Sequence, residues 1–180
     1  MELKTLEKIS KIFGQPVIPL CVPDGNGGCR VLGGSHGPGC PSPGKIPLVK
    51  GWQAPDWELT PRDLFKYARM GANWGMRLGG GVVELDFDDP AKYIDFLKSH
   101  TFPKDTPIMK TGRKGGGYKI ILKSKKQPPK NFIHNGFEVR SKGLLVIPDS
   151  LHKSGDRYRW LSLNGHIPEV NLEELLGVNF

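Results

Sequence analysis

Gly79-Gly80-Gly81-Val82-Val83-Glu84-Leu85-Asp86-Phe87-Asp88 is the stretch from which the fold is best predicted. The three glycines indicate a turn, and the apolar run that follows is typical of a strand. Asp86 and Asp88 are two residues apart, so in a strand both carboxylates project from the same face. Two ionised carboxylates repel each other, and such a pair usually has a cation between them. The stretch therefore predicts a strand that ends in a magnesium-binding pair of acids.

The elements around this stretch predict the fold class. Helical spacing and helix-start residues predict helices over residues 3–14 and 60–71, from residue 89, and over 171–176. Runs of apolar residues predict strands at residues 16–22, 74–78, 82–88, 108–111, 117–122, 136–140 and 144–147. We expect the glycine turn to join 74–78 to 82–88, and a hairpin to join 136–140 to 144–147. The fold class is therefore α+β, with a mixed, mainly antiparallel sheet and flanking helices.

The helix that begins at Asp89-Pro90 follows the acid pair directly. Aspartate is a favoured N-cap, and proline suits the first helical position. We expect Tyr93, Ile94 and Leu97 to form the buried side of this helix.

Length and charge favour one domain with a polyanionic partner. The 180 residues are expected to form a single domain, with an N-terminal lobe over 1–80, a catalytic sheet over 81–160 and a closing helix near 170–177. Lysine and arginine outnumber aspartate and glutamate by 26 to 18, which gives a net charge of +8. That excess favours nucleic acid or a nucleotide as the partner. The alternative is that the charge only keeps the protein soluble.

We expect neither an export signal nor a membrane segment. Leu3, Leu6 and Ile9 recur at helical spacing among charged residues, unlike the core of a signal peptide. No apolar run approaches the roughly 20 residues that a membrane span needs. We therefore expect a soluble, cytoplasmic protein.

A third acid, Glu138, is expected on a later strand. Alternation places Glu138 and Arg140 on the face opposite Phe137 and Val139. If this strand neighbours the one that carries Asp86 and Asp88, three carboxylates converge and can hold two magnesium ions about 4 Å apart. The alternative is that Glu138 and Arg140 are surface residues of an edge strand.

A loop rich in glycine and proline, residues 21–44, contains Cys21, Cys29, His36 and Cys40. Three thiolates and one imidazole satisfy tetrahedral zinc, although no Cys-x2-Cys pair is present. With an odd number of cysteines, a disulfide framework is not expected. The alternatives are a structural zinc site and a loop without metal.

Two basic segments are candidates for phosphate contact. Arg113 and Lys114 flank the glycines at residues 115–117, where the backbone can approach an anion closely. The run of lysines in residues 123–130 either follows a phosphate backbone or is a solvated loop.

The order of these motifs resembles the bifunctional DNA primase/polymerase (Prim-Pol) domain of the archaeo-eukaryotic primase superfamily. The resemblance covers roughly residues 16 to 160. It rests on the order of Pro43-Gly44-Lys45-Ile46-Pro47, Gly51-Trp52, Asn73-Trp74-Gly75, Leu85-Asp86-Phe87-Asp88, Thr111-Gly112-Arg113, Glu138-Val139-Arg140 and Pro148-Asp149-Ser150-Leu151-His152-Lys153-Ser154-Gly155.

The resemblance implies an RRM-like core and a two-metal transfer of a nucleotide to a 3′-hydroxyl. Asp86, Asp88 and Glu138 correspond to the family's acids, which hold Mg²⁺ or Mn²⁺. Ser150 and His152 match the loop near the incoming nucleotide, and His152 is alternatively a turn residue. The implied partners are a DNA template and primer, an NTP or dNTP, and a helicase or helical accessory domain, in the replication of a plasmid or virus.

One position departs from the family's pattern. Lys119 stands where a histidine usually follows the glycine turn. Lysine is a point charge and lacks the directed hydrogen bonding of a neutral imidazole. Three outcomes stay open: Lys119 replaces the histidine in holding the triphosphate; His134 or His152 takes over; or catalysis is weakened and binding persists. Arg140 is a further candidate nucleotide contact.

The sequence therefore favours a DNA primase/polymerase that uses Asp86, Asp88 and Glu138. The alternative is a catalytically weak or inactive module that binds DNA or nucleotide in replication initiation. A sugar-nucleotide transferase with an Asp-x-Asp pair is a third interpretation, but only about 80 residues precede the acids, too few for a large nucleotide-binding sheet.

Overall fold

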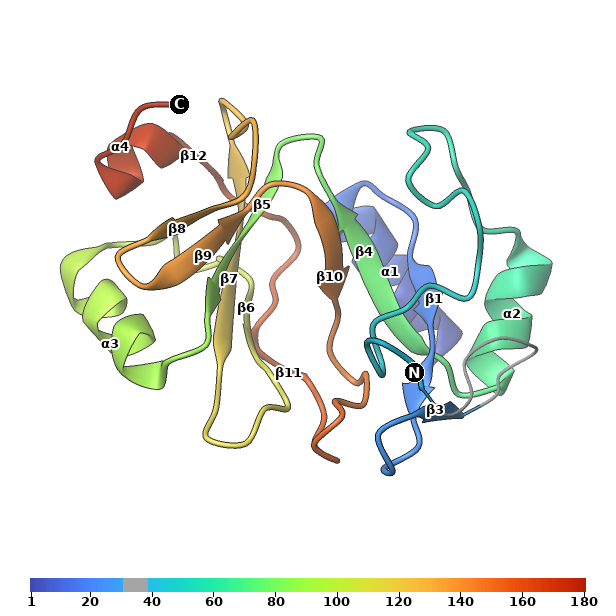
Figure 1. Cartoon of the computed structure of the whole chain (residues 1–180). Coiled ribbons are helices and arrows are strands. Elements are labelled where there is room, and N and C mark those ends of the chain that lie inside the picture. Colours follow the sequence, from blue (N-terminus) through green and yellow to red (C-terminus); the bar gives the residue numbers. More distant parts are fainter. Residues whose placement is uncertain (31–38) are drawn as a thin grey trace. The chain divides into compact units, whose positions relative to one another are not determined.

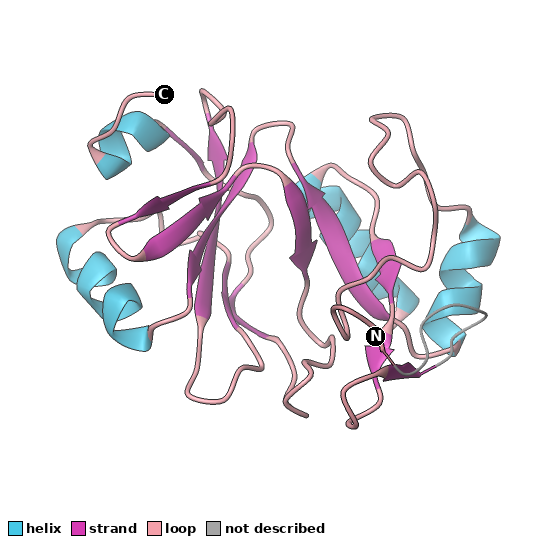
Figure 2. Ribbon diagram, in the orientation of Figure 1, coloured by secondary structure: helices cyan, strands magenta, loops and turns pink. Residues whose placement is uncertain are grey.

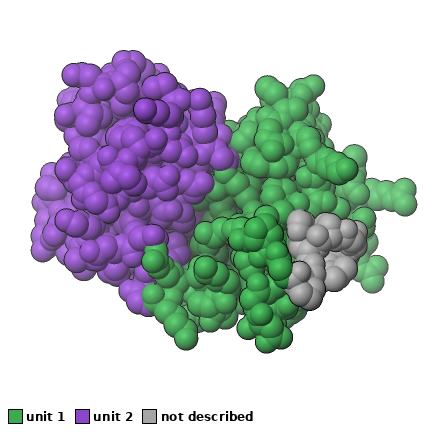
Figure 3. All heavy atoms as spheres, in the orientation of Figure 1, with its two compact units in different colours: residues 1–77, 112–114, 144–159 green, residues 78–111, 115–143, 160–180 purple. Residues whose placement is uncertain are grey.

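The computed structural model describes residues 1–30 and 39–180 of the chain. They belong to two compact units, which Figure 3 colours separately. Unit 1 comprises Met1–Arg77, Gly112–Lys114 and Leu144–Arg159, and unit 2 comprises Leu78–Thr111, Gly115–Gly143 and Trp160–Phe180. Each unit is therefore assembled from separate stretches of the chain.

Unit 1 contains a small sheet and two helices (Figure 1). The sheet has the order β1-β4-β10, and a separate pair of short strands, β2 and β3, lies in the cysteine-containing segment. Helix α1 ends at Gly14, whose φ of 64° is a left-handed cap that glycine adopts readily. The bounds are α1 Leu3–Phe13, β1 Ile18–Leu20, β2 Val22–Pro23, β3 Cys29–Arg30, α2 Pro61–Arg69, β4 Asn73–Leu78 and β10 Gly143–Val146.

Unit 2 is built on a seven-stranded sheet with the order β11-β6-β7-β5-β9-β8, and β12 pairs with β7 (Figure 2). The pairs β6–β7, β7–β5, β5–β9 and β9–β8 are all antiparallel, whereas β12 runs parallel to β7. The bounds are β5 Val82–Phe87, α3 Pro90–Ser99, β6 Ile108–Lys110, β7 Tyr118–Ser124, β8 Phe132–His134, β9 Phe137–Arg140, β11 Arg159–Ser162, β12 Glu169–Val170 and α4 Leu172–Leu176. The predicted α+β class, with antiparallel sheets and few helices, is confirmed.

The apolar core of unit 2 lies on one face of this sheet. Alternate residues of β5, namely Val83, Leu85 and Phe87, are fully buried there. The Phe87 ring stacks on Phe137 with the ring centroids 4.4 Å apart, and helices α3 and α4 add buried side chains to the same cluster. Because side chains alternate along a strand, the residues between these three project from the other face.

Helix α3 buries a different side from the one predicted. Tyr93 is buried as expected, but Ile94 is 50% exposed and Leu97 is 40% exposed. Phe96, three residues after Tyr93, takes the second core position and packs against Phe87 with centroids 5.2 Å apart. The i, i+3 pair of aromatic residues therefore sets the buried face.

The predicted hairpin between residues 136–140 and 144–147 is wrong. Strand β10 pairs with β4 in the small sheet, whereas β9 lies between β5 and β8. The real hairpin partner, β8, falls in a segment for which no strand was expected. Its turn is Asn135-Gly136, with φ of 47° and 87°, a two-residue turn of the kind that suits antiparallel strands.

The glycine turn is also only partly as expected. Gly79 and Val82 exchange backbone hydrogen bonds of 3.1 and 3.2 Å, so the turn forms. However, β4 and β5 continue into different sheets, and β5 ends at Phe87, one residue before Asp88. In the described part of the chain, no helix has the length and apolar character needed to cross a membrane.

Candidate active site

Charged residues occupy the face of β5, β7 and β9 opposite the apolar core. Asp86 lies directly opposite Lys119 on β7 and Glu138 on β9, and Glu84 lies opposite Arg140. Directly opposite residues of antiparallel strands project from the same face, with Cβ atoms roughly 5 Å apart. We call Glu84, Asp86, Lys119, Glu138 and Arg140 the charged face.

The two cations of the charged face join its acids into one network. The Lys119 ammonium donates to a carboxylate oxygen of Glu84 and, at 2.7 Å, to Oδ2 of Asp86. Arg140 Nη1 lies 3.3 Å from each carboxylate oxygen of Glu84, and Arg140 Nε lies 3.8 Å from Oε2 of Glu138. Glu84 is therefore held by both cations, whereas Asp86 and Glu138 each contact one.

Exposure rises across the charged face. The side chain of Glu84 is 0% exposed, that of Lys119 is 8%, that of Asp86 is 19% and that of Glu138 is 41%. The inner part of the network is therefore dry, and the outer edge, at Asp86 and Glu138, is open to solvent. A ligand from solution reaches the acids from that edge.

Burial and pairing act in opposite directions on the inner groups. Burial raises the pKa of Glu84 above its usual value, although Lys119 and Arg140 oppose this shift. Burial lowers the pKa of Lys119, but the carboxylates of Glu84 and Asp86 outweigh it and hold that pKa above its usual value. With two cations beside it, Glu84 has the counter-charges that an ionised buried carboxylate needs.

The structure brings two of the three predicted acids together. Asp86 and Glu138 are cross-strand neighbours, so the interpretation of Glu138 and Arg140 as edge-strand residues is wrong: β9 is flanked by β5 and β8. Asp88 is exposed and is the first residue after β5. Its position two residues beyond Asp86 therefore lies outside the regular strand.

Glu84 was missed by the analysis of the sequence. It stands two residues before Asp86 in the same strand, so the alternation that paired Asp86 with Asp88 applies equally to Glu84 and Asp86. The signal was an acidic residue in an otherwise apolar run, between Val83 and Leu85. A buried acid in such a run requires a partner, and Lys119 is that partner.

Lys119 and His134, two of the three residues predicted to take the role of the histidine that the resemblance implies, differ in placement. The Lys119 ammonium is engaged by Glu84 and Asp86 on the charged face. His134 lies opposite Phe137 and its ring packs edge-on against that core residue, with centroids 5.4 Å apart. His134 therefore belongs to the opposite face of the sheet from the acids.

His152 lies in unit 1, in a tight loop. Its Nδ1 accepts a 3.2 Å hydrogen bond from the backbone N–H of Ser154, so the neutral ring carries its proton on Nε2. Burial lowers the pKa of His152, and the positive charges of Lys45, Lys153 and Arg113 lower it further. This loop thus gathers several cations around a neutral imidazole, an arrangement suited to an anion.

Gly112 packs closely against the His152 loop. A Cβ atom on Gly112 would lie 2.5 Å from Cβ of His152 and 2.6 Å from the backbone oxygen of Asp156. The Ser154 hydroxyl donates to the backbone oxygen of Gly112. Because only glycine fits at this approach, the sequence Thr111-Gly112-Arg113 owes its glycine to packing.

Ser150 and the pair Arg113-Lys114 also belong to unit 1. The Ser150 hydroxyl is buried, accepts a 2.9 Å hydrogen bond from the Trp74 N–H and donates at 3.1 Å to the Trp74 backbone oxygen. The Ser150 hydroxyl thus joins its loop to β4, and its role as a nucleotide contact stays a prediction.

Cys21, Cys29 and Cys40 form a second candidate site, which we call the cysteine cluster. Their sulfur atoms all lie within 4.8 Å of one another, and all three residues are buried. A tetrahedral zinc with bonds of about 2.3 Å places its sulfur ligands about 3.8 Å apart, so the three thiols fit three corners. The fourth predicted ligand, His36, lies outside the described residues.

The surroundings of the cysteine cluster also suit a metal. The backbone N–H of Ile46 donates to Sγ of Cys21 at 3.4 Å, and a backbone hydrogen bond from Gly44 lowers the pKa of Cys29. Burial nonetheless dominates and raises the pKa of Cys29 overall. N–H groups directed at thiolate sulfur are the outer partners that orient metal ligands.

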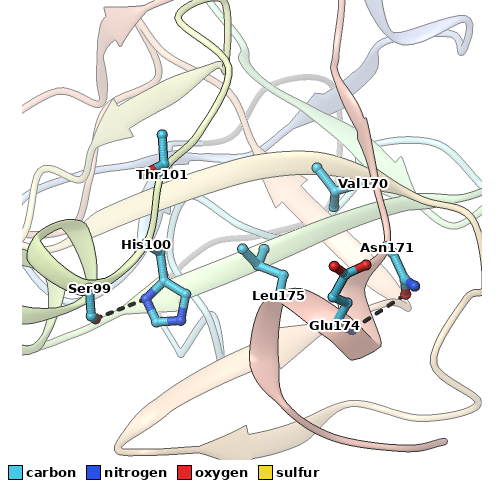
Figure 4. A pocket seen from close by; sticks show the side chains of 7 residues that line it. All are labelled: Ser99, His100, Thr101, Val170, Asn171, Glu174 and Leu175. Atoms are coloured by element: carbon cyan, nitrogen blue, oxygen red, sulfur yellow. Dashed lines mark hydrogen bonds between the residues drawn. The ribbon is translucent and has the colours of Figure 1, made fainter.

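A hollow of about 520 Å³ in unit 2 is lined by seven residues, none of which belongs to the charged face (Figure 4). It is lined by residues at the end of α3, including His100, and by residues in and just before α4, including Asn171 and Glu174. Both helices contribute to the core on the other face of the sheet. The hollow therefore does not include the acids of the charged face.

A comparison with protein families finds a match over nearly the whole chain. The model described as "Bifunctional DNA primase/polymerase, N-terminal" matches residues 8–174. This range contains the charged face, the cysteine cluster and His152. A comparison with curated proteins finds no match.

Proposed function

We propose that this chain, which belongs to the family of bifunctional DNA primases/polymerases, adds nucleotides to a 3′-hydroxyl on a DNA template at its charged face. The family supports nucleotidyl transfer with DNA and nucleotide as substrates. The resemblance also supports replication of a plasmid or virus as the setting, and a helicase or helical accessory domain as a partner.

The observation that carries this proposal is the pairing of Asp86 with Glu138. They lie directly opposite each other on adjacent strands in the interior of the sheet. Both side chains are partly exposed to solvent. Hard divalent cations prefer carboxylate oxygens in such an arrangement. Two acids that would otherwise repel each other thus have a functional reason to be neighbours.

The chemistry of Asp86 and Glu138 suits a divalent cation. We propose these two residues as oxygen ligands, with Asp88, the residue after β5, as a third, and Asp86 retains ligand capacity because Lys119 contacts only Oδ2. When bound, Mg²⁺ or Mn²⁺ would lower the pKa of the attacking hydroxyl and stabilise the leaving pyrophosphate. The role of the chain is to fix the carboxylates on two rigid strands, where their separation is set by the sheet.

In unit 1, the His152 loop and Arg113 are proposed to contact phosphate. The supporting observation is the set of cations, Lys45, Lys153 and Arg113, whose charges act on the imidazole. The N–H of a neutral imidazole can donate to a phosphate oxygen. Lys114, next in the chain, adds a further positive charge to the same segment.

The test is primer extension on a labelled primer–template with Mg²⁺ or Mn²⁺. We expect the wild-type chain to extend the primer and Asp86→Asn to lose about a thousandfold or more of the rate, which is about 4 kcal/mol of transition-state stabilisation. Asparagine keeps the size of the side chain and an oxygen that can accept from Lys119. DNA binding, measured by fluorescence anisotropy, should change little.

Asp95→Asn is the matched control, because Asp95 is an acid on α3 with a side chain that is 69% exposed. It should extend primers at the wild-type rate. Extension by Asp86→Asn at that same rate would remove the assignment of the charged face as the catalytic site.

A catalytically weak binding module is the second candidate function. The observation that favours it is the engagement of the Lys119 ammonium by Glu84 and Asp86, because this lysine stands where the family has a histidine. A binding module should show DNA affinity that falls steeply with salt, without metal-dependent affinity for a nucleotide. The enzyme should show both.

The cysteine cluster is proposed to hold a structural zinc ion. Three buried thiols whose sulfur atoms lie within 4.8 Å of one another support this assignment, with His36 as the proposed fourth ligand. Zinc binding would contribute directly to the folding free energy of the surrounding segment.

A further inference from the structure

Helix α2 of unit 1 (Figure 1) carries a stripe of exposed side chains. Four of its residues recur at the i, i+3, i+4, i+7 spacing that places side chains on one side of a helix, and all four are exposed: Arg62, Phe65, Lys66 and Arg69. On the opposite side Tyr67 is buried, and its hydroxyl donates to the Leu48 backbone oxygen at 3.4 Å. The packing of Tyr67 thus directs these four residues, which we call the α2 stripe, towards solvent.

The charges of the α2 stripe are all positive. In the described part of the chain, none of its three cations forms an ion pair with an acid. The acid of this helix, Asp63, instead accepts a 2.8 Å hydrogen bond from the Thr60 hydroxyl at the N-cap. Like charges four residues apart, as in Arg62 and Lys66, slightly destabilise a helix. The stripe is therefore unfavourable for the helix itself and suits an anionic partner.

An aromatic ring lies among these cations. Phe65 is 51% exposed, and the guanidinium carbon of Arg69 lies 5.7 Å from the centroid of its ring, a cation–π contact. One exposed apolar residue is common on protein surfaces. An exposed ring with cations on either side along the helix, however, offers both of the contacts that single-stranded nucleic acid uses: stacking for a base and positive charge for the backbone.

The distribution of charge between the units agrees with this assignment. Unit 1 has 15 lysines and arginines against 8 acids, a net charge of +7. Unit 2 has 11 against 10, a net charge of +1. Nearly all of the excess positive charge of the chain therefore belongs to the unit that carries the α2 stripe. Such a concentration of charge attracts a polyanion to that unit.

We propose that the α2 stripe binds single-stranded DNA, with a base stacked on Phe65 and phosphates held by Arg62, Lys66 and Arg69. The stripe extends about 10 Å along the helix, which corresponds to roughly three nucleotides of a strand. The inference deepens the proposed function, because it names a surface that holds the unpaired template. It rests on that function for the choice of DNA as the polyanion.

The test is fluorescence anisotropy with a labelled oligothymidylate of about 20 nucleotides, in the absence of divalent metal and nucleotide. Phe65→Leu keeps an apolar, helix-compatible side chain but has no ring, and we expect it to bind about tenfold more weakly than wild type. Phe65→Trp should bind at least as tightly as wild type. A strand of the same length without bases should bind wild type and Phe65→Leu equally, because it has no base to stack.

The cations are tested through the salt dependence of binding. The triple variant Arg62→Gln, Lys66→Gln, Arg69→Gln should lower the slope of log affinity against log salt by about 2, since each phosphate contact of a single strand contributes roughly 0.7.

Helix α1 provides a matched control. Its exposed lysines recur at i, i+4, i+7 in the same unit: Lys4, Lys8 and Lys11. Replacing these three by glutamine removes the same charge, and we expect the slope to change by less than about 0.5.

Each result decides for or against the inference. Equal affinity of Phe65→Leu and wild type for the oligothymidylate would overturn it, and so would equal changes of slope in the two triple variants, because these indicate only the general charge of unit 1. Loss of binding to phosphatidylserine vesicles by Phe65→Leu, with its DNA affinity unchanged, would assign the stripe to a membrane surface instead.

The inference and the proposed function fail separately, because binding is measured without metal or nucleotide. Primer extension by a chain whose DNA affinity is indifferent to Phe65 would leave the proposed function standing and remove the inference. The expected binding results without any primer extension would support the inference and remove the proposed catalysis.

Discussion

The cysteine cluster and the charged face are both candidate metal sites, but they differ in what surrounds the ligands. The three thiols pack against Ile46 and Leu48 and receive backbone N–H groups. The acids of the charged face instead have Lys119 and Arg140 as fixed counter-charges. Among the described contacts of the three thiols there is thus no lysine or arginine.

This difference separates two uses of a metal. A site whose ligands lie in an apolar surrounding needs the ion to be stable, so metal binding becomes part of folding. A site whose acids are already paired by cations of the chain can fold without metal and take up an ion for chemistry. We therefore expect unit 1 to depend on metal for its stability and unit 2 to be independent of it.

Removing the metal from the cysteine cluster should give the largest effect. Cys29→Ser, or a zinc chelator on the wild-type chain, should lower the opening free energy around the cluster by more than about 4 kcal/mol, since structural zinc contributes strongly to folding. Hydrogen exchange measures this at the amides of Cys21 and Leu48, which donate to Ile46 and Pro19 at 2.9 Å. Amides of β5 should keep their protection.

The control for this experiment is the chelator applied to Cys29→Ser, which should have no further effect. Zinc content of the wild-type chain, measured by mass spectrometry, should be one ion per chain. A wild-type chain that takes up no zinc and is indifferent to chelator would make the cluster an ordinary part of the apolar core, and the comparison would lose one of its two sites.

Truncating Phe87 should give the next largest effect, and it concerns unit 2. Phe87→Ala removes a fully buried ring that packs on Phe137, Tyr93 and Phe96. We expect a loss of about 3–5 kcal/mol in the free energy of unfolding, measured by urea denaturation. Phe65→Ala on α2 is the control, because Phe65 is 51% exposed and should cost far less. A loss for Phe87→Ala that depended on chelator would contradict the independence of unit 2 from metal.

Removing the buried acid of the charged face should have a smaller effect. Glu84→Ala leaves Lys119 paired with Asp86, and Arg140 keeps its contact with Glu138. Because each cation keeps one partner, we expect a loss of about 2–3 kcal/mol, below that for a fully unpaired buried charge. Glu84→Gln retains an acceptor of the same shape and should lose about half as much. Equal stability of Glu84→Ala and wild type in urea would mean that the network does not support the fold.

The sequence predicts the faces of the strands better than their neighbours. Alternation along β5 and β9 placed Asp86 and Glu138 on the faces opposite their apolar neighbours, because a period of two residues is a local property. Which strands lie side by side depends on contacts between residues that are far apart in the sequence. The strand at β10 was assigned to β9 because it is next in the chain, whereas in the structure it pairs with β4.

The same limit explains what was missed at the charged face. The resemblance implies that Lys119 contacts the nucleotide, but the sequence does not predict its ion pair with Glu84. Glu84 is 35 residues away in the chain and meets Lys119 only through the register of β5 and β7. Ile94 and Leu97 illustrate a second limit, since apolar residues on two sides of a helix leave its buried face undetermined until the neighbouring aromatic residues are placed.

The smallest expected effect concerns His152, the imidazole in unit 1 on which the charges of three nearby cations act. Burial and the charges of Lys45, Lys153 and Arg113 lower its pKa, so the unfolded chain binds the proton at higher pH than the folded chain does. Stability should therefore fall as pH drops through about 6.5, by less than about 1 kcal/mol once solvent screening is included. NMR titration of the ring should give a pKa below that of a free histidine, and Lys153→Gln should raise it. A ring that titrates at or above the ordinary value would contradict the effect of these cations on the imidazole, and with it the proposed phosphate contact in unit 1.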